Sequence, residues 1–459
     1  MTNLNPHKDE QDIIMPRRRA YDRTSTCVKC KLNPGNLVIQ HSIYCRSCFF
    51  PLVSNKFCRA LDQSLDLSSY MATIERARNV FIGFSGGSGS AVLLDLALQN
   101  CIVTPGASAP GRHHRASKQP PTKRRLVWKK AYVGFVDISG AFPDTNDRTS
   151  EIRTMMSRYP QYELVELRLE DAFDILWWRS LSKPLPATVT ASVEPGSNSS
   201  RDVHSPTSLE LLRTFLGSLP TPSAVSTSIS HIIRLLLLHA AEARSCSHLL
   251  LGSTSTSLSI SLISSVSSGG GFVLPSEREE IRRSVKIVKP LRDVTNKECA
   301  AWVHWSGLQV LQGGISLYEI RGVTQLTKDF IVGLDKNFPS TVSTISRTCA
   351  KLIPKAGTSG YCAFCQRSIQ SGVEEWKARI SIRSRQEPLP STEHRVHPLC
   401  YSCHTAFNSK GSKGSGNEVQ GTTAKFPVWV GSEELAVGEH KMMERHEMRV
   451  QLEEFLIQD

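Results

Sequence analysis

The sequence of 459 residues contains no run of about 18 apolar residues, the length that a helix needs to cross a membrane. The longest apolar candidate, residues 229–243, is interrupted by His231, Arg234 and His239. The N-terminal stretch is polar and lacks the apolar core of a signal peptide. We therefore expect neither a membrane partner nor secretion, and we expect a cytoplasmic protein.

Acidic residues are fewer than basic ones, which leaves a formal net charge of +13. Residues 104–130 contain eight lysines and arginines, four prolines and no acidic residue. This composition argues against a packed core, so we interpret the stretch as a surface insertion. Its basic side chains could bind the phosphates of a polyanion, although a passive insertion is an equal alternative. The candidate contacts are Lys123, Arg124, Arg125, Lys129 and Lys130.

Thirteen cysteines in a chain without a signal peptide favour metal ligation over disulfides. Eight of them form two sets of paired Cys-x2-Cys motifs, with spacers of fourteen and thirty-four residues. Two such pairs can surround one ion as a closed tetrahedron, so we predict two structural zinc sites; the alternative is pairs of reduced thiols. The ligands are Cys27, Cys30, Cys45 and Cys48 in the N-terminal set, and Cys362, Cys365, Cys400 and Cys403 in the C-terminal set. Single cysteines at positions 101, 246, 299 and 349 are interpreted as small buried hydrophobic residues.

A glycine-rich turn joins a predicted strand at residues 80–84 to a predicted helix at residues 91–101. Its sequence is Ser-Gly-Gly-Ser-Gly-Ser, which is neither a Walker motif nor Gly-x-Gly-x-x-Gly. Backbone N–H groups in such a turn can hold a phosphate, because glycine lets the ligand approach the main chain. The candidate nucleotide-binding residues are Ser85, Gly86, Gly87 and Ser90. An ordinary glycine–serine turn is the alternative.

The turn resembles the Ser-Gly-Gly-Lys-Asp-Ser loop of the PP-loop ATP pyrophosphatases, which adenylate a carbonyl oxygen before replacing it with nitrogen or sulfur. Here Ser88 stands at the lysine position and Gly89 at the aspartate position. A second predicted strand ends at Gly252, where those enzymes carry acidic residues that this chain lacks. A backbone cradle survives these changes, but the charges that handle pyrophosphate and magnesium do not. We expect no catalytic residue here, and ATP binding stays an open alternative.

Strands alternate with helices along the chain, which predicts an α/β fold with a parallel sheet and helices on both faces. The expected strands are residues 80–84, 131–139, 162–167, 249–251 and 284–289. The proposed divisions are a disordered tail at 1–25, an N-terminal zinc module at 26–60, a PP-loop-like α/β domain at 61–355 with insertions 104–130 and 182–208, and a C-terminal zinc module with a tail at 356–459.

Taken together, the motifs resemble one family, the second, non-catalytic subunit of the cytoplasmic tRNA wobble-uridine 2-thiolation complex. Besides the two cysteine sets and the two glycine turns, the motifs are residues 270–275, 290–293 and 338–342, with Arg347 and Thr348. The resemblance covers most of residues 25–405, without the two insertions.

The resemblance implies 2-thiolation of the wobble uridine, to give mcm5s2U, in cytoplasmic tRNAs for Lys, Glu and Gln. Sulfur would come from a thiocarboxylated ubiquitin-like carrier, and this chain would form a heterodimer with a catalytic PP-loop thiolase subunit. In that reading the basic residues named above bind tRNA. Two alternatives remain: an active ATP-dependent tRNA sulfurtransferase with an altered loop, or a zinc-containing nucleic-acid-binding scaffold unrelated to thiolation.

Overall fold

The computed structural model describes thirteen segments of the chain. They are residues 26–39, 42–64, 79–102, 128–142, 145–181, 206–282, 284–311, 320, 322–349, 351–352, 358–372, 399–408 and 426–430. The predicted tail at residues 1–25, most of both predicted insertions and most of the C-terminal tail lie outside these segments.

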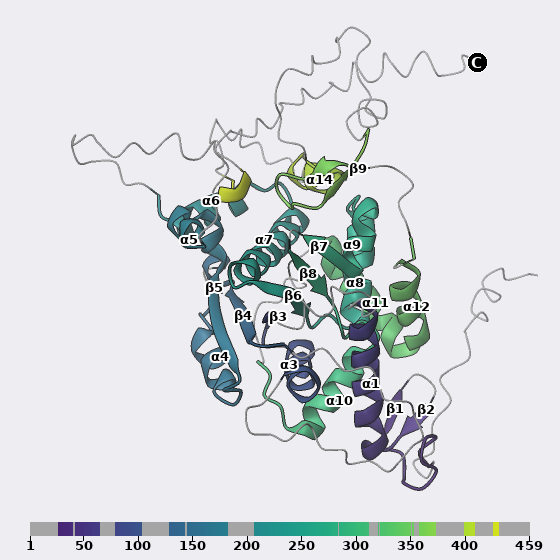
Figure 1. Cartoon of the computed structure of the whole chain (residues 1–459). Helices are drawn as coiled ribbons and strands as arrows, with labels where there is room; N and C mark the ends of the chain where they lie inside the picture. The colour runs from purple at the N-terminus through teal and green to yellow at the C-terminus, as the bar shows by residue number, and fades with distance from the viewer. Residues whose placement is uncertain are drawn as a thin grey trace, which may run out of the picture.

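A six-stranded sheet forms the centre of the molecule, with strand order β5-β4-β3-β6-β8-β7 (Figure 1). Its strands are β3 (Asn79–Gly83), β4 (Ala131–Asp137), β5 (Tyr162–Arg168), β6 (Cys246–Leu251), β7 (Glu279–Arg282) and β8 (Val285–Val288). All neighbours run parallel except β7 and β8. The predicted α/β fold is therefore confirmed. The antiparallel strand β7 was not predicted, because its sequence Glu-Glu-Ile-Arg carries little apolar signal.

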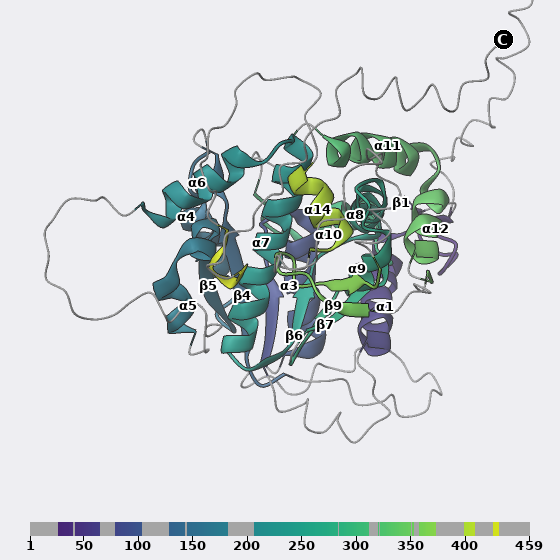
Figure 2. The same ribbon diagram turned by 90° about the horizontal axis from the view of Figure 1, so that it is seen from above.

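Helices cover both faces of this sheet and create two separate cores (Figure 2). The first core contains residues of α1 (Arg46–Ser64), α3 (Ser88–Cys101), α4 (Thr149–Met156) and α10 (Asn296–Ser306). The second contains residues of α6 (Ser208–Ser218) and α7 (Pro222–Ala243). Strand β3 is buried on both faces, whereas the edge strand β5 alternates buried and exposed residues.

Helix α7 is long and apolar enough to pass as a membrane span by composition alone. However, 72% of its apolar stretch is buried inside the protein, and its leucines belong to the second core. We therefore interpret α7 as an interior helix of the α/β domain.

Four further helices follow β6 or β8 along the chain. They are α8 (Ser255–Ser267), α9 (Leu274–Arg278), α11 (Val323–Asn337) and α12 (Pro339–Cys349). Among the described residues, helix α5 (Ile175–Ser180) and four short 3-10 helices lie in the domain and around it. The latter are η1 (Ser139–Ala141), η2 (Leu169–Phe173), η4 (Gly271–Val273) and η6 (Val428–Val430).

The two cysteine sets lie at opposite ends of the view in Figure 1. The N-terminal set is built on the hairpin of β1 (Leu37–Ile39) and β2 (Ser42–Tyr44) and on the start of α1. The C-terminal set is built on β9 (Thr358–Tyr361), β10 (Ser368–Gln370) and α14 (Tyr401–Asn408). Helix α1 runs without interruption through residue 60, so the N-terminal module and the α/β domain share one continuous element.

Candidate functional site

The sulfur atoms of each cysteine set converge on one point. Within each set, all four lie within 4.8 Å of one another, and all eight cysteines are free thiols. The Sγ atoms of Cys30 and Cys45 are 3.7 Å apart, as are those of Cys365 and Cys400. Four sulfurs about 2.3 Å from a central zinc ion would be about 3.8 Å apart at the corners of a tetrahedron. Both sets therefore fit a four-coordinate thiophilic ion with no open position.

Tight turns aim the N-terminal thiols inward. The N–H group of Lys31 donates to the carbonyl oxygen of Cys27 at 2.8 Å, and Lys31 adopts a left-handed φ of 57°. Cys45 and Cys48 sit at the start of α1, where the Phe49 N–H group donates to the Cys45 carbonyl oxygen. The hydroxyl of Ser47, 3.2 Å from the Cys45 sulfur, lowers the pKa of Cys45 to about 6. A thiolate, the form that binds metal, is thus favoured at neutral pH.

The C-terminal thiols are more deeply buried than the N-terminal ones, since all four are buried, whereas Cys30 and Cys48 are half-buried. A tight turn closes the first pair, with the Gln366 N–H group donating to the Cys362 carbonyl oxygen at 2.8 Å. Hydrogen bonds from the other three cysteines lower the pKa of Cys362. All four residues belong to the second core, so this cysteine set is part of the interior of the domain.

The glycine-rich turn lies between β3 and α3, as predicted. Gly86 has a φ of 78°, which glycine adopts without strain. The Ser90 hydroxyl donates to the Gly87 carbonyl oxygen at 2.9 Å and accepts from the Ser85 N–H group at 3.3 Å. The structure thus brings the four candidate nucleotide-binding residues together, with the Ser90 hydroxyl holding the backbone of the turn.

Two glycines close the turn from the side of β6. A Cβ atom on Gly89 would approach the Gly252 carbonyl oxygen closer than 3.0 Å, and a Cβ atom on Gly252 would lie 2.7 Å from the Ser90 nitrogen. The two strand-to-helix junctions are therefore in backbone contact between β3 and β6. This is the switch point where open α/β sheets bind ligands. Position 89, where the active loops carry aspartate, has no space for a side chain.

Leu311 covers the turn from another direction. Its N–H group donates to the Gly86 carbonyl oxygen at 2.9 Å, and its Cγ atom lies 2.7 Å from where a Cβ atom on Gly86 would stand. This contact was not predicted, because Leu311 is distant in sequence and belongs to no motif.

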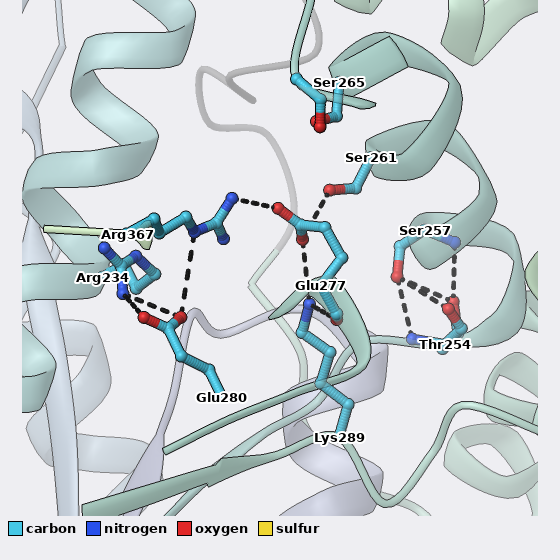
Figure 3. A network of polar contacts seen from close by, with 10 residues as sticks. Arg234, Thr254, Ser257, Ser261, Ser265, Glu277, Glu280, Lys289 and Arg367 are labelled. Atoms are coloured by element: carbon cyan, nitrogen blue, oxygen red, sulfur yellow. Dashed lines mark hydrogen bonds and ion pairs between the residues drawn. The ribbon is translucent and has the colours of Figure 1, made fainter. Parts of the chain in front are cut away.

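The residues after Gly252 act as a helix cap. Thr254 and Ser257 form the capping box of α8 (Figure 3). The Thr254 hydroxyl accepts from the Ser257 N–H group at 3.1 Å, and the Thr256 hydroxyl donates to Asp335 at 3.1 Å. Where the PP-loop enzymes carry acidic groups, this chain carries hydroxyls that stabilise its own fold.

The candidate polyanion contacts are described only in part. Lys129 and Lys130 are exposed immediately before β4, whereas Lys123, Arg124 and Arg125 lie outside the described residues. The amino ends of the parallel strands β3 and β4 lie together, and the glycine turn follows the carboxyl end of β3. The structure therefore places these lysines at the end of the sheet opposite the turn.

Three of the four single cysteines named above are buried. Cys101, Cys246 and Cys299 are buried, and the side chain of Cys349 lies outside the described residues. Burial raises the pKa of Cys246 to about 12, so its thiol stays protonated at neutral pH. These positions agree with the prediction of small buried hydrophobic residues.

Comparisons with known proteins return one name repeatedly. A family model described as cytoplasmic tRNA 2-thiolation protein 2 matches residues 322–405. A protein of that name from Phaeosphaeria nodorum is 25% identical over 416 residues, which cover 87% of this chain and 99% of that protein. One from Drosophila mojavensis is 24% identical over 375 residues, covering 77% of this chain and 78% of that protein. The human protein of that name is 31% identical over 212 residues, covering 42% and 41%.

Among solved structures, the U34-tRNA thiolase NcsA from Methanococcus maripaludis, solved with its 4Fe–4S cluster, is similar with a TM-score of 0.47 and 15% identity. The similarity covers 79% of this chain and 99% of that one. The sequence matches confirm the family resemblance that the motifs indicated.

Proposed function

We propose that this chain, a relative of the proteins named cytoplasmic tRNA 2-thiolation protein 2, is the non-catalytic subunit of a tRNA 2-thiolation complex. The observation that carries the proposal is the extent of the similarity, which spans 99% of one relative bearing that name. The substrate would be the wobble uridine of cytoplasmic tRNAs for Lys, Glu and Gln, modified to mcm5s2U. A catalytic PP-loop subunit would be its partner, and a thiocarboxylated ubiquitin-like carrier would deliver the sulfur.

The geometry of the glycine turn supports a non-catalytic role. Adenylation needs a cation on pyrophosphate and a carboxylate near magnesium, and Ser88 and Gly89 supply neither. The contact between Gly89 and Gly252 leaves no room for the missing carboxylate. The chain would contribute to the reaction by supporting the partner and by binding tRNA through Lys123, Arg124, Arg125, Lys129 and Lys130.

The two cysteine sets would hold zinc as structural ions. Four thiolates complete the coordination shell, so the ion supplies folding free energy. The proposed divisions stay as zinc modules at residues 26–60 and 356–459, the latter with its tail, around a PP-loop-like domain at 61–355, although α1 continues across residue 60 and the C-terminal cysteines pack in the second core.

The test is to delete the gene for this chain in its own organism and to analyse the wobble uridines of cytoplasmic tRNAs by mass spectrometry. We expect 2-thiouridine to disappear from tRNAs for Lys, Glu and Gln and to return when the full chain is re-expressed. Unchanged 2-thiouridine in the deletion strain would refute the proposal and favour a zinc-containing scaffold unrelated to thiolation.

A further inference from the structure

Arg367 comes two residues after Cys365 of the C-terminal cysteine set, and its guanidinium contacts Glu277 and Glu280. The preceding residue, Gln366, has a left-handed φ of 55°, and the Cys362 N–H group donates to the Arg367 carbonyl oxygen at 2.8 Å. The metal-binding turn therefore fixes the direction in which the Arg367 side chain leaves the backbone. Figure 3 shows this side chain reaching two glutamates of the α/β domain.

These glutamates belong to a buried network of five charges. Arg367 Nη1 lies 2.5 Å from Glu277 Oε1, and its Nε lies 3.8 Å from Glu280 Oε2. Lys289 bonds to Glu277 at 3.1 Å and Arg234 to Glu280 at 2.8 Å. The side chains of Arg367 and Glu277 are each only 8% exposed. Burial alone would raise the pKa of Glu277, but the charges of Arg367 and Lys289 hold it well below its usual value.

The network would be opposite in sign to a metal-loaded C-terminal cysteine set. Three cations and two carboxylates leave one positive charge in excess. A divalent ion bound by four thiolates carries two negative charges, so the excess cation lies next to an anionic cluster. Arg234 also touches that cluster's backbone, because its guanidinium donates to the carbonyl oxygen of Cys365. The contacts therefore run from the metal-binding turn to β7, α7 and the residue after β8.

The N-terminal set has different surroundings. Its sulfur atoms receive polar contacts from Ser47 and Asn33, which are exposed neutral residues. Two of its four ligands are only half-buried. The two cysteine sets thus have the same ligands and similar sulfur spacing, but only the C-terminal one is joined to buried charges of the domain by the described contacts.

We propose that Arg367 is a positioning residue for a tetrahedral thiophilic cation at the C-terminal cysteine set. The bound ion fixes the backbone turn at residues 362–367, which places Arg367 between Glu277 and Glu280. The charge network, for its part, keeps this backbone turn closed around the ion. Loss of the ion releases Arg367 and leaves Glu277 with only Lys289 and Glu280 with only Arg234 as buried cationic partners, which is unfavourable. The C-terminal site therefore releases its ion more slowly than the N-terminal site, and its occupancy is linked to the stability of the parallel-sheet domain.

The experiment measures the loss of metal from both cysteine sets in one sample of the full chain loaded with zinc. Under native conditions with excess chelator, cysteines are alkylated over time, and peptide mass spectrometry follows each cysteine separately. We expect the N-terminal ligands to be alkylated at least about tenfold faster than the C-terminal ligands, the range seen when groups around a metal's ligands are altered. Equal rates for the two sets in the unmodified protein would overturn the proposal.

Variants then test Arg367 itself. Arg367→Met should speed alkylation of the C-terminal ligands by about tenfold and leave the N-terminal rate unchanged, while Arg367→Lys should have a smaller effect. Arg347→Met is the matched control, because Arg347 is 65% exposed and pairs with Asp293 at 3.5 Å on the surface. A lower melting temperature for Arg367→Met with an unchanged C-terminal alkylation rate would mean an ordinary ion pair and would refute the positioning role. Should Arg367→Met not fold, Arg367→Lys still decides, because an alkylation rate at the C-terminal ligands equal to that of the unmodified protein would refute the positioning role.

Discussion

The backbone carbonyl oxygen of Gly252 lies closer than 3.0 Å to the position that a Cβ atom on Gly89 would occupy. The obstacle is backbone, so a small rotation of a side chain cannot relieve it. The chain therefore lacks more than the aspartate of the active loops, because the space for that aspartate is filled. Ser88→Lys together with Gly89→Asp should not create adenylating activity.

The first prediction concerns this contact. Gly89→Asp should lower the free energy of unfolding by about 1–3 kcal/mol, as overpacking of a closed site does, and should not create adenylating activity. Thermal unfolding measures the first effect and ATP–pyrophosphate exchange the second. Gly333→Asp is the control, since nothing beyond its chain neighbours and the nearby backbone of its own helix lies within 4 Å of its Cβ position among the described residues. A Gly89→Asp protein as stable as this control would contradict the structure.

The second prediction concerns the isolated chain. We expect no ATP–pyrophosphate exchange, because Ser88 and Gly89 replace the two side chains that handle pyrophosphate and magnesium. The assay is run with tRNA present and without the catalytic partner. AMP release that depends on tRNA and on this chain alone would favour the alternative of an active sulfurtransferase.

The third prediction concerns metal content. Elemental analysis of purified protein should find two zinc ions per chain, one for each cysteine set. Cys27→Ser and Cys400→Ser should each lose one ion and lower the soluble yield, because zinc binding contributes folding free energy. Cys101→Ser, at a buried cysteine outside both sets, should keep both ions. Well under two ions in the unmodified protein would refute the assignment.

The fourth prediction concerns RNA binding by the complex. Replacing Lys123, Arg124, Arg125, Lys129 and Lys130 with Gln should reduce the slope of log affinity for tRNA against log salt. The reduction should reach up to about 0.9 per lost contact on duplex regions, because each contact releases counterions. Lys336→Gln with Lys351→Gln provides a control at exposed lysines elsewhere. An unchanged slope with normal thiolation would show that residues 104–130 are a passive insertion.

The position of Lys129 and Lys130 affects how this result is interpreted. They precede β4, at the amino end of the parallel strands, whereas the glycine turn follows the carboxyl end of β3. A tRNA held by these lysines would therefore approach the sheet from the end opposite the turn. The sequence had not indicated that these lysines and the glycine turn lie at opposite ends of the sheet.

Local patterns in the sequence determined the two four-cysteine groups and most of the sheet. Cys-x2-Cys places two thiols on one tight turn independently of distant residues. The spacing of Cys362 and Cys365 was therefore sufficient to predict that their thiols lie together. The buried strand β3 was equally clear, because a short apolar run before a glycine turn is a local signal. The short polar strand β7 was missed, since its pairing with β8 makes it a strand and its own residues do not.

By itself, then, the sequence determined which chemical groups this protein offers: eight thiols in two sets, and a glycine turn without lysine or aspartate. Only the tertiary structure decided what surrounds them. Gly252 closes the space beside Gly89, and Glu277 receives Arg367, although each pair is far apart in the chain. The physical reason is that such contacts depend on how whole helices and strands pack against one another. No short stretch of residues contains that information.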